Sequence, residues 1–170
     1  MVALAPFTEA DIDRLIAWVS SPQVLGQWAA SGLSYPLTRA QIAAHMRRSA
    51  ETGGRMFKAL DDNRSVMGHV ELGSIDRVNR SLRIGRVFVA PERRGRGLCA
   101  DLVRAALGVA FDQLRMHRVE LAVFDFNRAA IACYERVGFR REGVRREMFE
   151  SGNGYWSEIV MSMLESEWRG

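Results

Sequence analysis

The sequence of 170 residues predicts one α+β domain over residues 1–170, with a mixed, mostly antiparallel sheet of six or seven strands and helices on both faces. Hydrophobic residues make up 48% and charged residues 26%, a composition typical of globular domains. No repeat, low-complexity tract or linker interrupts the chain. The spacing of its apolar residues predicts, in chain order, a strand, several helices, a three-strand meander, a helix, a strand, a helix and a hairpin.

The first fifty residues predict one strand and three helices. Residues 2–7 read as the strand. Each following helix begins at a hydroxyl side chain that can cap its first N–H groups. The predicted starts are Thr8 with Asp11 as a capping box, Ser21 before Pro22, and Thr38 with Gln41 as a second capping box.

The rest of the chain predicts two hairpins separated by two helices and a buried strand. The strands of the first hairpin are joined by a turn over residues 61–64, and residues 151–154 turn the second. Gly138 is a good C′ residue for the second helix. The predicted strands are 56–60, 66–72, 82–89, 119–124, 139–149 and 155–163, and the predicted helices are 98–109 and 127–137.

A glycine-rich turn between the strand at 82–89 and the helix after it is the most informative local feature. Gly95 and Gly97 let the backbone turn tightly and bring its N–H groups close to a ligand. These donors are unsatisfied at a helix start, where the macrodipole favours negative charge. Arg93, Arg94 and Arg96 add positive charge. The segment therefore predicts a site for phosphate or pyrophosphate.

The same turn satisfies the glycine pattern of dinucleotide-binding domains over residues 95–100. That fold needs repeated βαβ crossovers and an acidic residue at the end of the next strand, about 20 residues on. Here a meander precedes the turn, and Asp125 comes about 30 residues after Gly95, too late for the usual ribose contact. A dinucleotide-binding module is therefore disfavoured.

A second motif follows the buried strand one crossover later. It has the form N-x-x-A-x-x-x-Y-x-x-x-G-F, with matches at Asn127, Ala130, Tyr134, Gly138 and Phe139. Together with the R-x-x-G-x-G/A-like turn at residues 94–99, it resembles the GCN5-related N-acetyltransferase (GNAT) family. The resemblance implies a GNAT-like fold and acetyl transfer from acetyl-CoA to an amine by direct attack in a ternary complex.

The resemblance also implies which residues hold the cosubstrate. The backbone at the turn would bind the CoA pyrophosphate, and the strand edge at Phe88 and Val89 would pair with the pantetheine arm. The Val89 N–H would also donate to the thioester oxygen. Asn127 would bind the pantetheine or the adenosine phosphate, besides capping its helix. The residues of the turn are Arg94, Gly95, Arg96, Gly97, Leu98 and Cys99.

Tyr134 is the residue expected to take part in the chemistry. The matching tyrosine of the family donates its proton to the CoA sulfur as the tetrahedral intermediate collapses. Spacing alone would make this tyrosine a core residue, three positions after Ile131 on one helix face.

The general base stays open. Where relatives carry an acid, this chain has Arg83 or its neighbours and Ala122. Glu71 and His69 share a strand face and could supply a base directly or through water. For each of them, a structural role is expected more than a catalytic one. An amine bound as its free base needs no such side chain. His45 and His117 are assigned no role.

The acceptor is expected to be a primary amine. Similarities over residues 68–85 and 141–147 favour the branch that acetylates ribosomal-protein N-termini, but small-molecule amines such as aminoglycosides or polyamines stay open. Aromatic side chains predict its pocket between the early helices and the final hairpin; they are Trp28, Tyr35, Tyr155 and Trp156. The absence of an acid leaves a non-catalytic acyl-CoA sensor as an alternative, which Asn127 and Tyr134 disfavour.

Composition sets the remaining expectations. The net charge of +4 comes with charges of both signs interspersed, so nucleic-acid binding is not expected. No signal peptide or apolar run of membrane-spanning length is visible, so no membrane association is expected. Cys99 and Cys133 read as reduced thiols without metal-ligand spacing, which favours a cytoplasmic protein and no metal. A homodimer is suggested by the family resemblance alone.

Overall fold

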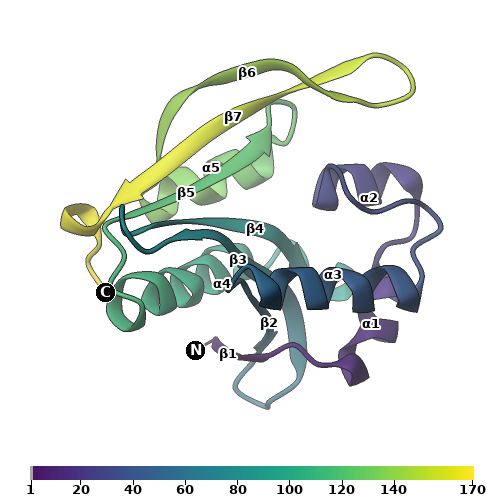
Figure 1. Cartoon of the computed structure of the whole chain (residues 1–170), viewed down its shortest axis with the longest axis horizontal. Coiled ribbons are helices and arrows are strands. Elements are labelled where there is room, and N and C mark those ends of the chain that lie inside the picture. Colours follow the sequence, from purple (N-terminus) through teal and green to yellow (C-terminus); the bar gives the residue numbers. More distant parts are fainter. Residues whose placement is uncertain (1) are drawn as a thin grey trace.

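The structure, a computed structural model, describes residues 2–170 and contains one seven-stranded sheet in the order β1-β2-β3-β4-β5-β7-β6 (Figure 1). Only β4 and β5 pair in parallel, and every other pair of neighbours is antiparallel. This confirms the predicted mixed sheet. The strands are β1 (Ala3–Pro6), β2 (Arg55–Leu60), β3 (Val66–Asp76), β4 (Ser81–Val89), β5 (Arg118–Phe124), β6 (Arg140–Glu150) and β7 (Tyr155–Leu164).

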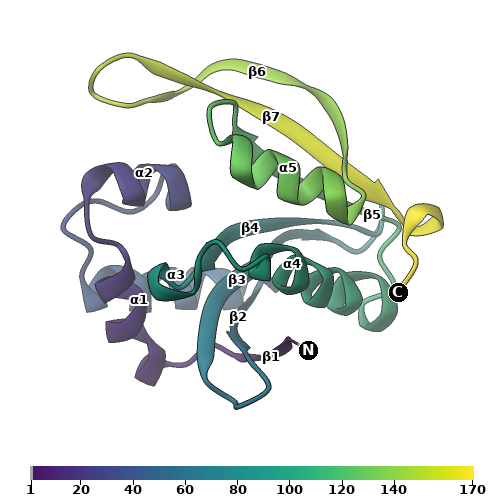
Figure 2. The same cartoon turned by 180° about the vertical axis from the view of Figure 1, so that it is seen from behind.

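Helices cover both faces of the sheet, as expected. The first three lie on one face, and the last two lie on the other, as the two opposite views show (Figures 1 and 2). The helices are α1 (Ile12–Trp18), α2 (Pro22–Ala29), α3 (Arg39–Glu51), α4 (Leu98–Gly108) and α5 (Arg128–Val137). A π-helical turn over Val109–Gln113, which the sequence analysis did not anticipate, extends α4.

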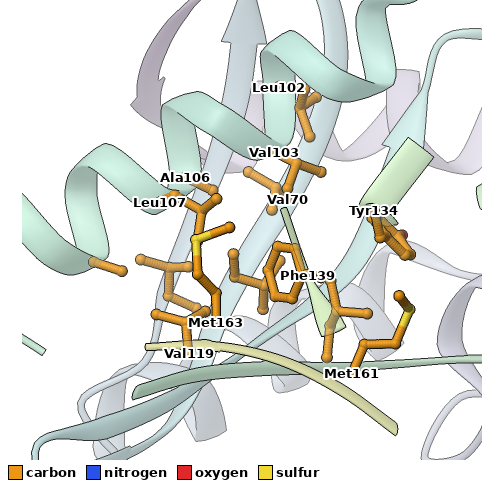
Figure 3. Close-up of a cluster of buried hydrophobic side chains, with 14 of the residues drawn as sticks. Val70, Leu102, Val103, Ala106, Leu107, Val119, Tyr134, Phe139, Met161 and Met163 are labelled. Carbon is orange, nitrogen blue, oxygen red and sulfur yellow. The ribbon is translucent and has the colours of Figure 1, made fainter. Parts of the chain in front are cut away.

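Two apolar cores result from this layering. The larger lies between the sheet and α4 and α5, where Leu102, Phe139 and Met163 are fully or almost fully buried (Figure 3). The smaller lies under α1, α2 and α3 and includes Ile12 and Phe88. The sheet is therefore buried on both sides over its centre, which fixes β3 and β4 as a rigid base for a site.

The helix caps follow the sequence prediction with one exception. Asp11 Oδ2 accepts hydrogen bonds from the Thr8 N–H and hydroxyl, both at 2.9 Å, so the first capping box is present. Thr38 Oγ1 caps α3 by accepting from the Gln41 N–H at 3.3 Å. The second half of that box was predicted wrongly, because Gln41 Oε1 accepts from the Ser34 N–H at 2.8 Å instead.

The sheet opens at its centre, between β4 and β5. These strands pair over only three residue pairs, from Ser81 with Arg118 to Arg83 with Glu120. Beyond Arg83 the two strands diverge (Figure 1). A bulge in β4 accompanies the divergence, because two residues stand opposite Val70 and the second half of β4 is thereby bent.

Within residues 2–170, no helix combines the length and apolar character that crossing a membrane requires.

Candidate active site

A cavity of about 880 Å³ occupies the opening between β4 and β5. One part of its wall comes from the glycine-rich turn and α5, and includes Gly97, Asn127 and Tyr134. The other part comes from α2, β3 and the first half of β4, and includes Trp28 and Glu71. Most of the predicted cofactor-binding residues and the predicted acid therefore line one continuous space.

The end of β4 offers a free backbone edge to this cavity. The Ala90 N–H donates to the Met67 carbonyl of β3 at 2.9 Å, whereas the Val89 carbonyl accepts from Arg94 Nε at 3.2 Å. Both backbone groups of a strand residue point to the same side, and that side alternates along the strand. The Val89 N–H therefore points away from β3, toward the opening. Phe88 lines the cavity while its ring is buried in the smaller core.

The glycine-rich turn presents a row of unpaired donors. Gly95 and Gly97 have φ angles of +76° and +75°, so both need the left-handed conformation that glycine adopts freely. Gly97 precedes the first residue of α4 and provides no side-chain cap. Among residues 2–170, no hydrogen bond from the backbone N–H groups of residues 95–99 is found. Five consecutive donors are thus available to an anion.

The arginines of this turn are only partly occupied by protein partners. Arg93 pairs with Asp61 at 3.3 Å, and the Arg94 guanidinium lies 4.9 Å from the centre of the Phe88 ring. Arg96 is exposed and does not line the cavity. This charge, together with the donors and the N-terminus of α4, fits a pyrophosphate group.

Asn127 begins α5 and caps it. Its Oδ1 accepts a hydrogen bond from the Ala130 N–H at 3.2 Å, so the capping role considered from the sequence is present. Asn127 also lines the cavity, and its side-chain amide nitrogen has no partner within residues 2–170. Gly138 ends the helix with a φ of +115°, as its C′ position predicts.

Tyr134 lies on α5 with only 7% of its surface exposed, and it lines the cavity next to two thiols. Burial first, and then the neighbouring Cys99 and Cys133, raise the pKa of its hydroxyl well above the usual value. The phenol therefore stays protonated. The Sγ atoms of Cys99 and Cys133 are in contact at 2.6 Å, and both cysteines are free.

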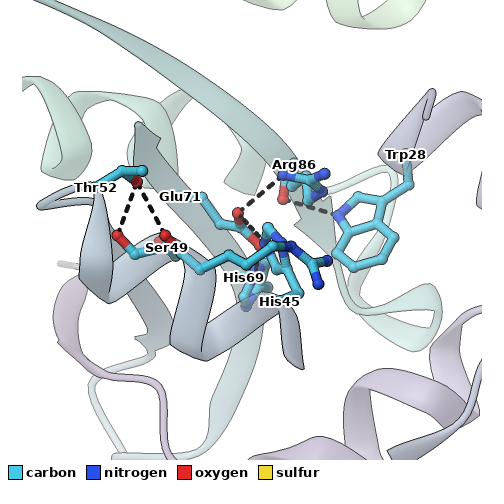
Figure 4. Close-up of polar contacts among 8 residues, drawn as sticks. Trp28, His45, Ser49, Thr52, His69, Glu71 and Arg86 are labelled. Atoms are coloured by element: carbon cyan, nitrogen blue, oxygen red, sulfur yellow. Dashed lines mark hydrogen bonds and ion pairs between the residues drawn. The ribbon is translucent and has the colours of Figure 1, made fainter. Parts of the chain in front are cut away.

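Glu71 anchors a buried polar cluster at the wall opposite α5 (Figure 4). Its Oε1 contacts His69 Nε2 at 3.0 Å, and its Oε2 contacts His45 Nε2 at 2.8 Å and Arg86 Nη1 at 3.1 Å. The Arg86 carbonyl accepts from Trp28 Nε1 at 2.8 Å, which fixes α2 against the bulge of β4. Three segments distant in sequence thus meet on one carboxylate.

The surroundings of Glu71 make it a weak proton acceptor. Burial alone would raise the pKa of this carboxyl, but hydrogen bonds from His45 and His69 and the charge of Arg86 outweigh it and hold the pKa well below the usual range. The arrangement therefore favours an anchoring role for Glu71 over the base considered from the sequence.

The aromatic residues expected around the acceptor divide into two groups. Trp28 lines the cavity. Tyr35, Tyr155 and Trp156, for which the sequence left a core position equally open, do not line it. Tyr35 and Tyr155 are exposed, and Trp156 packs against Phe124 with ring centroids 5.0 Å apart. Trp156 of the final hairpin is therefore held by packing against β5.

Sequence reasoning also missed several charged residues of the wall. Arg83, Arg86 and Glu158 line the cavity, and His45 holds Glu71 from α3. His45 carried no local signal, since its partner lies 26 residues away. Arg83 and Arg86 occupy the strand segment in which relatives of the family carry an acid.

The comparisons with known proteins agree with this geometry. Residues 2–140 match the family model described as an acetyltransferase (GNAT) domain. The chain is 30% identical over 165 residues to the "Putative ribosomal N-acetyltransferase YdaF" of Bacillus subtilis, covering 94% of this chain and 89% of that protein. It is 32% identical over 124 residues to spermidine N(1)-acetyltransferase of Vibrio cholerae, covering 73% and 69% of the two proteins.

The same fold occurs in a solved structure. The crystal structure of spermidine N-acetyltransferase from Vibrio cholerae in complex with CoA and spermine superposes with a TM-score of 0.87, at 24% identity, over 98% of this chain and 96% of that one. The resemblance drawn from the two motifs is thus confirmed, and the dinucleotide-binding alternative is excluded. The family model and the relatives therefore agree with the unpaired donors of the glycine-rich turn. The chain belongs to the GNAT family and is an acetyl-CoA-dependent N-acetyltransferase.

Proposed function

We propose that the glycine-rich turn and α5 hold acetyl-CoA and that the acceptor amine attacks it in the opening between β4 and β5. The single observation that carries this proposal is the row of five unpaired N–H groups at residues 95–99, at one end of the cavity. A pyrophosphate satisfies such donors together with Arg94. The side-chain amide of Asn127 is free to bind a further polar group of CoA.

The reaction needs a donor for the thioester oxygen and an acid for the departing sulfur. The Val89 N–H faces the opening and is fixed by the β3–β4 pairing, so it can stabilise the developing negative charge. One such preorganised donor contributes about 3–4 kcal/mol to transition-state stabilisation. Tyr134 keeps its proton because burial raises its pKa, so the phenol is present as an acid beside the departing sulfur. The proton that it gives to the sulfur is replaced by the proton that the attacking nitrogen loses, which leaves the CoA thiol, the amide and a neutral phenol.

Deprotonation of the amine requires no side chain of the cavity in this scheme. The carboxylate of Glu71 is saturated by three donors, and Glu158 accepts from Arg145 at 2.8 Å. Arginines near the reacting nitrogen disfavour an ammonium ion, because like charges oppose the charged form. The amine is therefore expected to react as the free base and to attack the thioester directly.

The acceptor is a primary amine, either a protein N-terminus or a small molecule. Support for both comes from the relatives, whose names include a ribosomal N-acetyltransferase and a spermidine acetyltransferase. A melting experiment tests cosubstrate binding. Acetyl-CoA at one hundred times its Kd stabilises the folded protein by about 2.7 kcal/mol and raises Tm, whereas NAD leaves Tm unchanged. The reverse result would refute the proposed site.

A further inference from the structure

The charges of the cavity carry information about the acceptor. Of residues 2–170, seven charged residues line it, five of them arginines, and none of these lining residues is an aspartate. Three of the arginines belong to the CoA end, on the turn and α5. The remaining charged residues surround the other end, and they are Glu71, Arg83, Arg86 and Glu158.

Both carboxylates at this end already pair with basic side chains. Both oxygens of Glu71 are occupied, by His45, His69 and Arg86, and the residue is only 5% exposed. One oxygen of Glu158 accepts from Arg145 at 2.8 Å, and the other lies 3.9 Å from Arg83. A second ammonium group on the acceptor would meet carboxylates whose charge is already balanced by basic side chains.

The two arginines, by contrast, keep unused donors. A guanidinium has five N–H donors. Arg83 has a side chain 35% exposed, and within residues 2–170 its only ion-pair contact is the one at 3.9 Å. Arg86 uses Nη1 on Glu71, while its buried Nε has no partner. The side chains of both arginines line a space whose other wall is apolar, at Trp28 and Val24 of α2.

We infer that the acceptor is a primary amine that also carries a carboxylate, and that Arg83 and Arg86 bind this carboxylate while the amine faces the end of β4. This inference rests on the proposed function and narrows it. A planar guanidinium matches a carboxylate with paired hydrogen bonds, and these are stronger than bonds between neutral groups. A polyamine would bring further positive charge against the same arginines and is disfavoured.

An acceptor panel tests the inference with acetyl-CoA at saturation. It contains glutamate, a C-terminally amidated tetrapeptide with acidic residues at positions 1 and 2, its amidated lysine counterpart and spermidine. CoA release gives kcat/KM, and mass spectrometry identifies the acetylated product. We expect at least one carboxylate-bearing acceptor to exceed spermidine and the lysine peptide by tenfold or more. The first two acceptors separate a free amino acid from a protein N-terminus as the source of the carboxylate.

Variants of Arg83 test whether this residue causes the preference for acidic over basic acceptors. Arg83→Glu should reduce the ratio of acidic to basic acceptors by tenfold or more, whereas Arg83→Lys should retain most of it. Arg55→Glu makes the same charge change at an exposed position outside the cavity and should leave the ratio unchanged. Calorimetric titration with CoA should give the same Kd for all three variants as for the wild type.

The outcomes separate the inference from the proposed function. Preferential acetylation of spermidine or of the lysine peptide, or a ratio that Arg83→Glu does not change, would overturn the inference and leave acetyl transfer in place. CoA bound normally but no acetylation of any panel member would count against the carboxylate-bearing acceptor. Failure of acetyl-CoA to bind would overturn the proposed function as well.

Discussion

Replacing Glu71 by glutamine tests whether this carboxylate anchors the site or acts as a base. Glutamine keeps the size of the side chain but removes the negative charge that Arg86, His45 and His69 share. Arg86 would then be a largely buried cation without a counter-ion, since its side chain is 23% exposed. Removing one partner of a buried pair typically lowers the free energy of unfolding by about 3–5 kcal/mol.

Urea unfolding at pH 7 measures this change. Glu135→Gln is the matched control, because Glu135 pairs with Arg141 at 2.7 Å but both side chains are exposed, at 44% and 54%. An exposed pair contributes about 0–1 kcal/mol, so the control should unfold almost as the wild type does.

The pH dependence follows from the lowered pKa of Glu71. A carboxyl whose pKa is lower in the folded state contributes fully above its unfolded value of about 4.3 and loses that contribution as pH falls below it. The wild type should therefore lose progressively more stability than Glu71→Gln as pH falls below about 4.3.

A different pair of results would refute the anchoring role. If Glu71→Gln unfolds like the wild type while kcat falls and the acidic limb of the pH–rate profile disappears, Glu71 is the general base. The structural reading of its three hydrogen bonds would then be wrong.

Three further predictions concern the turn, the acid and the sheet. Tyr134→Phe should lower kcat by about 100-fold or more in a stopped assay and leave the Kd for CoA, measured by calorimetry, unchanged. An unchanged kcat would reject the acid role. Gly97→Val forces a β-branched residue to a φ of +75°, which costs about 1–3 kcal/mol, so calorimetry should show weaker CoA binding; an unchanged Kd would show that the turn is not the cradle. Gly68→Ala places a Cβ 2.6 Å from the Phe88 carbonyl oxygen and should lower the free energy of unfolding, measured in urea, by about 1–3 kcal/mol. Gly73→Ala is the control, because its Cβ would meet no atom within 4 Å. Equal free energies of unfolding for the two variants would contradict this packing.

The sequence predicted those parts of the molecule whose signals are local. The positive φ angles at Gly95 and Gly97, the cap at Asn127 and the C′ glycine at residue 138 all follow from conformational preferences of single residues. Apolar patterns and turn residues together predicted every strand, with ends displaced by a few residues. β3 in particular continues to Asp76, past the predicted end at residue 72.

The acceptor end of the cavity could not be predicted in the same way. Glu71, His45 and Arg86 come from three elements, and their contact depends on the bulge that bends β4. Arg86 has a φ of +47° without being glycine, so no residue preference indicates the bulge. Tertiary packing also explains the position of Trp156, which packs against the Phe124 ring and does not line the cavity.

The divergence of β4 and β5 has a consequence for solubility. A sheet normally exposes unpaired strand edges only at its margins, where a second chain can add to them and start aggregation. This sheet has an additional pair of edges in its interior, shielded by helices on both faces. The protein can therefore offer strand-like hydrogen bonding to a slender ligand at a place where a β-strand of a neighbouring molecule is not expected to add to the sheet.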